Sequence, residues 1–179
     1  SSGGKAMGFA GNQNNLITAK KLEMAVKDSD SNIEKILDLG FVGEPISINS
    51  SFINDNIVKG IIPVIAPLGR DGKGNTYNIN ADTAAGAIAG ALRASKLLLL
   101  TDIAGILDEN KKLISSLSYE EAKKIISKDF ILGGMKPKIA TCIKAISQGV
   151  KQATILDGRI PHALILELFT EHGIGTQIY

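Results

Sequence analysis

The segment Tyr77–Asp82 alternates polar and apolar side chains, and its polar members are two amides and a carboxylate, Asn78, Asn80 and Asp82. Side chains alternate along a strand, so Asn78 and Asn80 should point to the same side. Asp82 can cap the helix of small residues that is predicted from Asp82 to about Ala94. Three polar groups would then meet at one strand end. The alternative is purely structural, because Asn and Asp are ordinary residues of turns and caps.

A second group of chemical interest is Gly133–Lys138, where lysines lie at the start of a predicted helix. A lysine in the first turn of a helix opposes the helix dipole by a few tenths to about 1 kcal/mol. This is understandable if an anion binds there, since phosphate favours the free N–H groups of a helix start. Lys138 could then neutralise charge that develops on a transferred phosphoryl group. Two solvated lysines in a loop are the alternative.

Further candidates follow predicted strands, because ligands of parallel α/β sheets bind beyond the carboxyl ends of the strands. Thr101 and Asp102 offer a hydroxyl and a carboxylate for the ribose and phosphates of a nucleotide, and Gly105 would let the backbone approach a ligand closely. A polar strand exit with a glycine turn explains this segment equally well. For Asp157-Gly158-Arg159, at another strand end, a turn with a local ion pair is favoured.

Other reactive side chains are predicted to be structural. The two histidines, His162 and His172, are too isolated for a metal-ligand cluster, and we expect His162 to be a surface residue at a helix start. Cys142, the single cysteine, lies in a predicted amphipathic helix and should be a buried thiol. The sequence contains no Walker A motif.

The elements that must position these residues alternate from Asp82 onward, which predicts an α/β fold with a mostly parallel central sheet flanked by helices. The segment 33–41 suits either a helix or an extended chain, residues 28–32 should form a loop tip, and residues 71–75 a hairpin loop. Strands are expected at 6–10, 16–26, 45–49, 61–67, 96–101, 153–156 and 175–179. The run 96–101 should be covered on both faces. Helices are expected after a cap at Asn49 or Ser50, at 82–94, at 118–127 after the capping box Ser118–Glu121, from Pro137 to near Gly149, and from Pro161 to before Gly173.

Composition narrows the function classes. The chain has 179 residues, 44% of them hydrophobic, and 20 basic against 18 acidic residues give a net charge of +2. This balance argues against nucleic acid or an anionic membrane as the main partner. No apolar run reaches transmembrane length, and a cytoplasmic protein is expected. The sequence enters in mid-pattern without an initiator Met, so we expect it to be part of a longer chain.

Several segments, in this order, resemble the amino-acid kinase family and, within it, the acetylglutamate kinases. The segments are 3–6, 15–19, 39–43, 62–67, 77–82, 100–102, 133–135, 157–164 and 173–176. The resemblance implies transfer of the γ-phosphoryl group of ATP to the side-chain carboxylate of N-acetyl-L-glutamate, on the route to arginine. Mg²⁺ would be bound mainly through the ATP phosphates.

The resemblance also implies roles for individual residues. Asn78 would hold the substrate, with Asn80 close by. Asp82 would orient two catalytic lysines, and Lys138 would stabilise the transferring phosphoryl group, as positioning and positive charge require. The residues that would line the nucleotide are Thr101, Asp102, Ile103, Gly105, Ile106, Leu107, Phe130, Ile131, Leu132 and Met135.

The family's glycine-rich phosphate loop, its first catalytic lysine and its substrate-clamping arginine would all precede residue 1. Residues 1–94 would then be the remnant of the substrate-binding and dimerisation lobe and residues 95–179 the nucleotide-binding lobe, and the isolated chain is expected to be inactive.

Lys136 stands where the family has an apolar residue. The segment 162–176 resembles forms that L-arginine inhibits, and a homo-oligomer is expected, either a dimer or a hexamer of dimers. Two alternatives stay open: a non-catalytic nucleotide- or arginine-binding regulatory module, and an amino-acid kinase for another acid.

Overall fold

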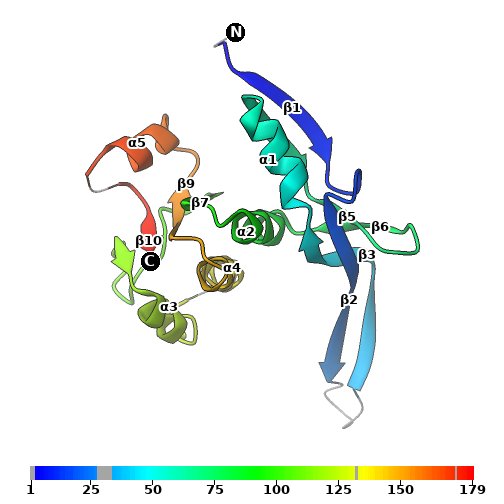
Figure 1. Cartoon of the computed structure of the whole chain (residues 1–179). Helices are drawn as coiled ribbons and strands as arrows, with labels where there is room; N and C mark the ends of the chain where they lie inside the picture. The colour runs from blue at the N-terminus through cyan, green and yellow to red at the C-terminus, as the bar shows by residue number, and fades with distance from the viewer. Residues whose placement is uncertain (1–2, 28–33, 132, 172) are drawn as a thin grey trace. The chain divides into compact units, whose positions relative to one another are not determined.

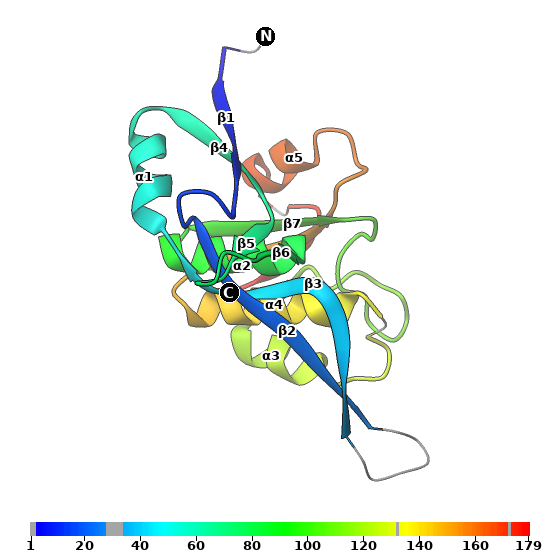
Figure 2. The same ribbon diagram turned by 90° about the vertical axis from the view of Figure 1, so that its right-hand side faces the viewer.

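The computed structural model describes residues 3–27, 34–131, 133–171 and 173–179 (Figures 1 and 2). The chain divides into two compact units, Ser1–Ile88 and Ala89–Tyr179. The division falls inside helix α2 (Ala81–Leu92). From the sequence, the boundary between the two lobes was expected near Ala94, just beyond the end of this helix. Each unit is described by itself.

The first unit is built around a closed barrel of strands β2 (Ile17–Lys27), β3 (Glu34–Ile48), β6 (Thr76–Ile79) and β5 (Leu68–Arg70). β2 and β3 form a long antiparallel hairpin with two register shifts. Pairing with β2 makes the ambiguous segment extended from Glu34 onward, so that it continues into the strand predicted at 45–49. The predicted loop tip at 28–32 lies outside the described residues. Buried residues of the barrel include Leu16, Ile17, Ala19, Tyr77 and Ile79.

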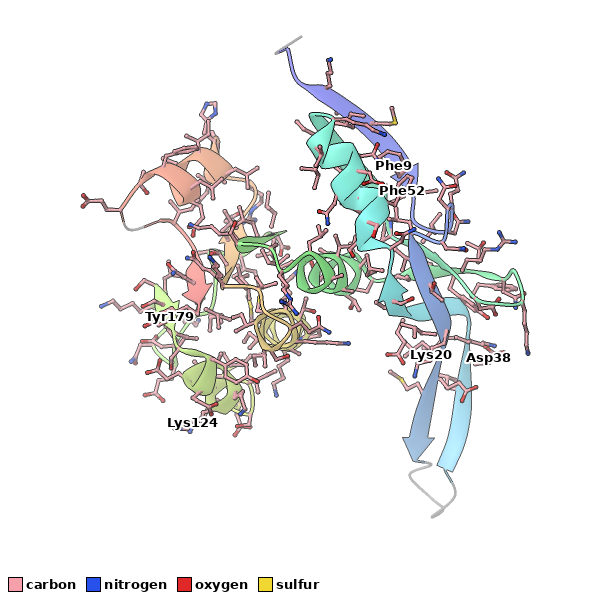
Figure 3. All side chains as sticks on the ribbon, viewed as in Figure 1. Phe9, Lys20, Asp38, Phe52, Lys124 and Tyr179 are labelled. Atoms are coloured by element: carbon pink, nitrogen blue, oxygen red, sulfur yellow. The ribbon has the colours of Figure 1, made fainter. Side chains whose placement is uncertain are left out.

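A two-stranded parallel sheet of β1 (Lys5–Ala10) and β4 (Ile61–Ala66) completes this unit together with helix α1 (Ser50–Val58). Asn49 caps α1, as predicted, because its Oδ1 accepts a hydrogen bond from Phe52 N at 3.1 Å. The rings of Phe9 and Phe52, labelled in Figure 3, meet edge to face with their centroids 5.1 Å apart. This contact ties α1 to β1.

The predicted hairpin at 71–75 connects β5 to β6, and α2 follows directly. The prediction that Asp82 caps this helix is wrong. Asn80 Oδ1 accepts a hydrogen bond from Thr83 N at 3.1 Å, so Asn80 is the capping residue and Asp82 lies in the first turn. The helix starts one position earlier than expected because β6 ends at Ile79 and leaves Asn80 free to cap.

The second unit contains a four-stranded sheet in the order β7 (Lys96–Thr101), β9 (Gln152–Asp157), β10 (Thr176–Ile178) and β8 (Ser116–Leu117). β7 and β9 are parallel, β9 and β10 antiparallel, and β10 and β8 parallel. The predicted α/β class is therefore confirmed, with helices flanking sheets that contain parallel strands. β9 is the buried strand. Leu97 and Leu99 are buried on one face of β7, whereas Leu100 on the other face is 47% exposed, so the expected cover on both faces is wrong at this end of the strand.

Three helices accompany this sheet: α3 (Tyr119–Ile125), α4 (Met135–Ser147) and α5 (Ala163–Phe169). The predicted capping box is present, with Ser118 and Glu121 bonded reciprocally. Cys142 is fully buried in α4, as expected. α5 begins at Ala163 rather than Pro161 because His162 has a left-handed backbone with φ of 60°. None of the helices in the described ranges has the length and apolar character needed to cross a membrane.

Candidate functional site

An apolar pocket of about 160 Å³ lies in the second unit, beyond the carboxyl end of β7. Two segments far apart in the sequence build it, one following β7 and one preceding and opening α4. Its lining residues are Ile103, Gly105, Leu107, Phe130, Ile131 and Met135. All of them belong to the predicted nucleotide-lining set. Whole small-molecule sites measure roughly 300–1,000 Å³, so this pocket has the size for one ring system rather than for a complete ligand.

One wall of the pocket belongs to a small hairpin formed by residues 106–114. Ile114 N donates to Ile106 O at 2.9 Å, and Leu107 forms an antiparallel bridge with Leu113. The side chain of Asp108 closes the turn by accepting hydrogen bonds from Asn110 N at 2.9 Å and Lys112 N at 2.8 Å. Ile106 itself is fully buried, so it supports the wall without lining the pocket.

A buried threonine from β10 holds this hairpin from behind. Thr176 Oγ1 accepts a hydrogen bond from Ile106 N at 2.8 Å and donates one to Ile114 O at 2.6 Å. Thr176 belongs to the segment 173–176 that resembles the family, but no role was predicted for it from the sequence. Its signal in the sequence is weak, because it is one polar residue in a short final strand that also contains Gln177, and its two partners lie 70 and 62 residues away.

The polar groups predicted at the strand ends are neighbours in the sheet. Thr101 and Asp157 occupy paired positions at the ends of β7 and β9, and Gly158 N donates to Thr101 O at 2.8 Å. Thr101 Oγ1 donates to Asp102 Oδ1 at 3.3 Å. Hydroxyl, carboxylate and guanidinium groups therefore gather at the edge of the sheet where ligands of such folds bind.

The local ion pair favoured for Asp157 and Arg159 is confirmed. Arg159 Nη2 lies 2.8 Å from Asp157 Oδ2, and Arg159 Nε donates to Asp157 Oδ1 at 2.9 Å. These side-chain hydrogen bonds, assisted by a backbone N–H of Arg159, lower the pKa of Asp157 to about 2. Asp157 thus remains an anion, matched by one cation, at any physiological pH.

Helix α4 begins at the pocket. Met135 lines the pocket, and Lys138 follows three positions later, a spacing that places both on one side of the helix. Lys138 is half-buried, whereas Lys136 is exposed. The residue at the N-cap position is Gly134. Because glycine has no side chain, it offers the N–H groups of the first turn no side-chain acceptor. Of the predicted nucleotide-lining residues, Leu132 lies outside the described part of the chain.

The predicted substrate residues belong to the first unit. Asn78 and Asn80 are exposed while Tyr77 and Ile79 are buried, so the two amides share one face, as the alternation predicted. Asp82 is half-buried in the first turn of α2. Because Asp82 and Lys138 lie in different units, their joint action stays a prediction.

Metal-ligating side chains do not cluster in the described ranges. They contain no group of three or more His, Cys, Asp or Glu side chains that could hold a metal ion.

Comparison with known proteins identifies the family to which the chain belongs. The sequence pattern of the amino acid kinase family matches residues 2–157. The acetylglutamate kinase of Afipia carboxidovorans is 55% identical over 177 residues, which is 99% of this chain and 60% of that relative. The chain thus spans about 60% of the length of the curated relatives it matches.

Solved structures agree on the fold. The N-acetylglutamate synthase from Neisseria gonorrhoeae, complexed with coenzyme A and L-arginine, superposes with a TM-score of 0.81 and 27% identity, over 99% of this chain and 38% of that one. The carbamate kinase from Giardia lamblia bound to AMP-PNP superposes with a TM-score of 0.61 over 87% of this chain and 51% of that one. At 20% identity, the second likeness concerns the fold alone.

Proposed function

This chain belongs to the amino acid kinase family, and from that premise we propose that the protein phosphorylates the side-chain carboxylate of N-acetyl-L-glutamate with ATP, in arginine biosynthesis. A carboxylate oxygen attacks the γ-phosphorus, the bond from that phosphorus to the β-phosphate oxygen breaks, and an acyl phosphate and ADP are formed. The observation that carries the proposal is the ring-sized apolar pocket at the end of β7, which opens onto the start of α4.

The pocket suits the base of the nucleotide. All its lining side chains are apolar or absent, and Phe130 and Met135 offer large polarisable surfaces to a flat ring. Thr101, Asp102 and the Asp157–Arg159 pair lie at the ends of the adjacent strands, where the ribose and phosphates of a nucleotide would pass. The phosphates would meet the first-turn N–H groups of α4, which attract anions.

Lys138 supplies the positive charge that phosphoryl transfer needs. It lies one helical turn beyond Met135, so a nucleotide whose base occupies the pocket can extend its phosphates toward it. Such transfers depend on positioning and on neutralisation of charge at the transferring group. Bound with ATP, Mg²⁺ would add charge neutralisation at the phosphates.

The acid substrate is assigned to the first unit. Asn78 and Asn80 present amide groups on one exposed face of the chain at the end of β6, and amides can hold both a carboxylate and an acetamide. Asp82, in the first turn of α2, would orient catalytic lysines. A cytoplasmic location and a homo-oligomeric state remain predictions.

Acyl phosphate formation tests the proposal directly. The full-length protein is incubated with ATP, Mg²⁺ and N-acetyl-L-glutamate, and the product is trapped with hydroxylamine, with L-glutamate and L-aspartate in parallel. We expect hydroxamate from N-acetyl-L-glutamate alone. Hydroxamate from another acid instead would show an amino-acid kinase of different specificity. The 179-residue chain, assayed alongside, should give no product.

A second candidate is a non-catalytic module that binds a nucleotide or L-arginine. The superposition on a synthase complexed with L-arginine supports this candidate. A folded full-length protein that binds ATP or L-arginine but yields no hydroxamate from any of the three acids would support this module. If the protein is a kinase, L-arginine added to the same assay tests inhibition.

A further inference from the structure

We propose that Thr176 is a positioning residue for the nucleotide, acting through the wall of the apolar pocket. The inference rests on the proposed function, because it assigns that pocket to the base of ATP. Thr176 does not line the pocket. Its hydroxyl instead fixes the backbone of the 106–114 hairpin, which contributes Leu107 to the wall next to Gly105.

The hydroxyl of Thr176 both donates and accepts a hydrogen bond. It accepts from Ile106 N at 2.8 Å and donates to Ile114 O at 2.6 Å, and the residue is completely buried. Ile106 and Ile114 also bond to each other through Ile114 N and Ile106 O at 2.9 Å. The three hydrogen bonds close a small ring across the base of the hairpin. Since Ile106 lies between the pocket-lining Gly105 and Leu107, the ring determines where both of them lie.

Gly105 connects Thr176 to the pocket even more directly. A Cβ atom at this position would lie 2.6 Å from Thr176 Oγ1 and 2.8 Å from Leu113 Cδ1, and the backbone has φ of 151°. Glycine is therefore required by both the close approach and the backbone conformation. The backbone of Gly105 is in contact with the threonine on one side and lines the pocket on the other.

The strand that carries Thr176 is anchored independently of its hydroxyl. Gln177 N donates to Ser115 O at 2.9 Å, Tyr179 N donates to Leu117 O at 3.2 Å, and β10 also pairs with β9. Removing the hydroxyl should therefore leave the sheet in place and release the hairpin, which is the part that touches the pocket.

The chain offers a matched control. Thr154, on the neighbouring strand β9, is as deeply buried as Thr176, and its Oγ1 has no hydrogen-bond partner among the described residues. A threonine-to-valine change keeps the shape and removes only the hydroxyl. At position 154 it removes a hydroxyl without a partner, and at position 176 it removes two hydrogen bonds.

The test uses the full-length protein with Thr176→Val, Thr176→Ser and Thr154→Val. Calorimetry gives the Kd for ATP, steady-state kinetics give both KM values and kcat, and thermal unfolding reports folding. Thr176→Val should raise the Kd and KM for ATP severalfold, and by no more than roughly thirtyfold, because ATP would then have to re-order a hairpin that two hydrogen bonds hold in place in the wild type. The KM for N-acetyl-L-glutamate should stay within twofold, Thr176→Ser should restore ATP binding, and Thr154→Val should match wild type.

Equal ATP affinity in Thr176→Val and Thr154→Val would overturn the inference while leaving the proposed kinase intact. A rise in both KM values together would show general structural damage and would also overturn it. If Thr176→Val fails to fold, Thr176→Ala removes the same hydroxyl with a smaller side chain and should give the same selective rise in the Kd for ATP. A wild-type protein that binds ATP but yields no acyl phosphate removes the kinase proposal, and the calorimetry still decides the role of Thr176.

Discussion

The hydroxyl of Tyr77 donates a hydrogen bond to Oδ2 of Asp71 at 2.9 Å, across the turn that joins β5 to β6. The same carboxylate accepts hydrogen bonds from the backbone N–H groups of Lys73 and Asn75 and from Asn75 Nδ2. One side chain thus closes the whole hairpin. Because Asn78 follows Tyr77 directly, this hairpin also presents the predicted substrate amides.

These contacts predict a stability that depends on pH. Hydrogen bonds from the Asn75 side chain, then from the Asn75 backbone, Tyr77 and Lys73, lower the pKa of Asp71 from 3.8 to about 2. A depressed pKa stabilises the folded state fully above about pH 4, and the stabilisation disappears as the pH falls through about 2. Asp71→Asn should therefore unfold at lower urea than wild type at pH 7, and this difference should shrink below pH 4.

The control for this experiment is Asp55→Asn, an acidic residue on the exposed side of α1. It should change the urea midpoint little at either pH. A difference between Asp71→Asn and wild type that stays constant from pH 7 to pH 2.5 would contradict the assigned role of the carboxylate.

Substitutions of the two amides at the end of β6 should have different effects, on stability at Asn80 and on substrate binding at Asn78. Asn80→Ala removes the cap of α2 and should lower the free energy of unfolding by about 1 kcal/mol, as cap deletions do. Asn80→Asp retains a capping oxygen and should recover most of this. Asn78→Ala, at an exposed position, should stay within about 0.5 kcal/mol of wild type yet raise the KM for N-acetyl-L-glutamate. Urea unfolding and steady-state kinetics measure the two effects, and an unchanged KM for Asn78→Ala would remove this residue from the site.

Two lysines in the first turns of α4 provide a matched pair. Lys138→Ala should lower kcat by a factor of about 10²–10³, the range for loss of one charge-stabilising group, with the Kd for ATP nearly unchanged. Lys136→Ala removes the same charge from an exposed position and should leave kcat within about twofold. Single-turnover kinetics with both variants measure the chemical step. Equal losses in the two variants would show that general electrostatics, rather than a positioned cation, is at work.

Phe130 should contribute to nucleotide affinity through its ring. Phe130→Ala should raise the KM for ATP by roughly five- to thirtyfold, corresponding to about 1–2 kcal/mol of lost apolar contact. The KM for N-acetyl-L-glutamate should not move. Phe169→Ala is the control, because Phe169 is 81% exposed on α5 and does not line the pocket. The pocket is not the base site if ATP binds both variants as tightly as wild type.

Features that depend on near neighbours could be predicted from the sequence. The capping box of Ser118 and Glu121 and the hairpin at 71–75 involve residues within a few positions of one another, and both are present. The helix cap at Asn80 was missed although it is local, because Asp82 is an equally good capping residue. Only the last residue of β6 decides between them.

Features that depend on distant partners could not be predicted in this way. The segment after residue 33 has apolar spacing that suits two conformations, and pairing with β2 selects the extended one. Thr176 acts on residues 62 and 70 positions away. The pocket residues Ile103, Leu107 and Ile131 carry no chemical signature of their own, so only the family resemblance pointed to them, whereas Thr101, Asp102 and Lys138 could be proposed from their chemistry.

The parallel pairing of β1 with β4 has a consequence for how the chain folds on the ribosome. Lys5 pairs with Ile61 and Ala10 with Ala66, so β1 leaves the exit tunnel well before its partner. At about 5–20 residues per second, the roughly 55 intervening residues take about 3–11 seconds to synthesise. During that time β1 lacks β4, the strand with which it pairs among the described residues. Until β4 emerges, the edge of β1 that will pair with it stays open to chaperones, and slow synthesis through α1 would lengthen this interval.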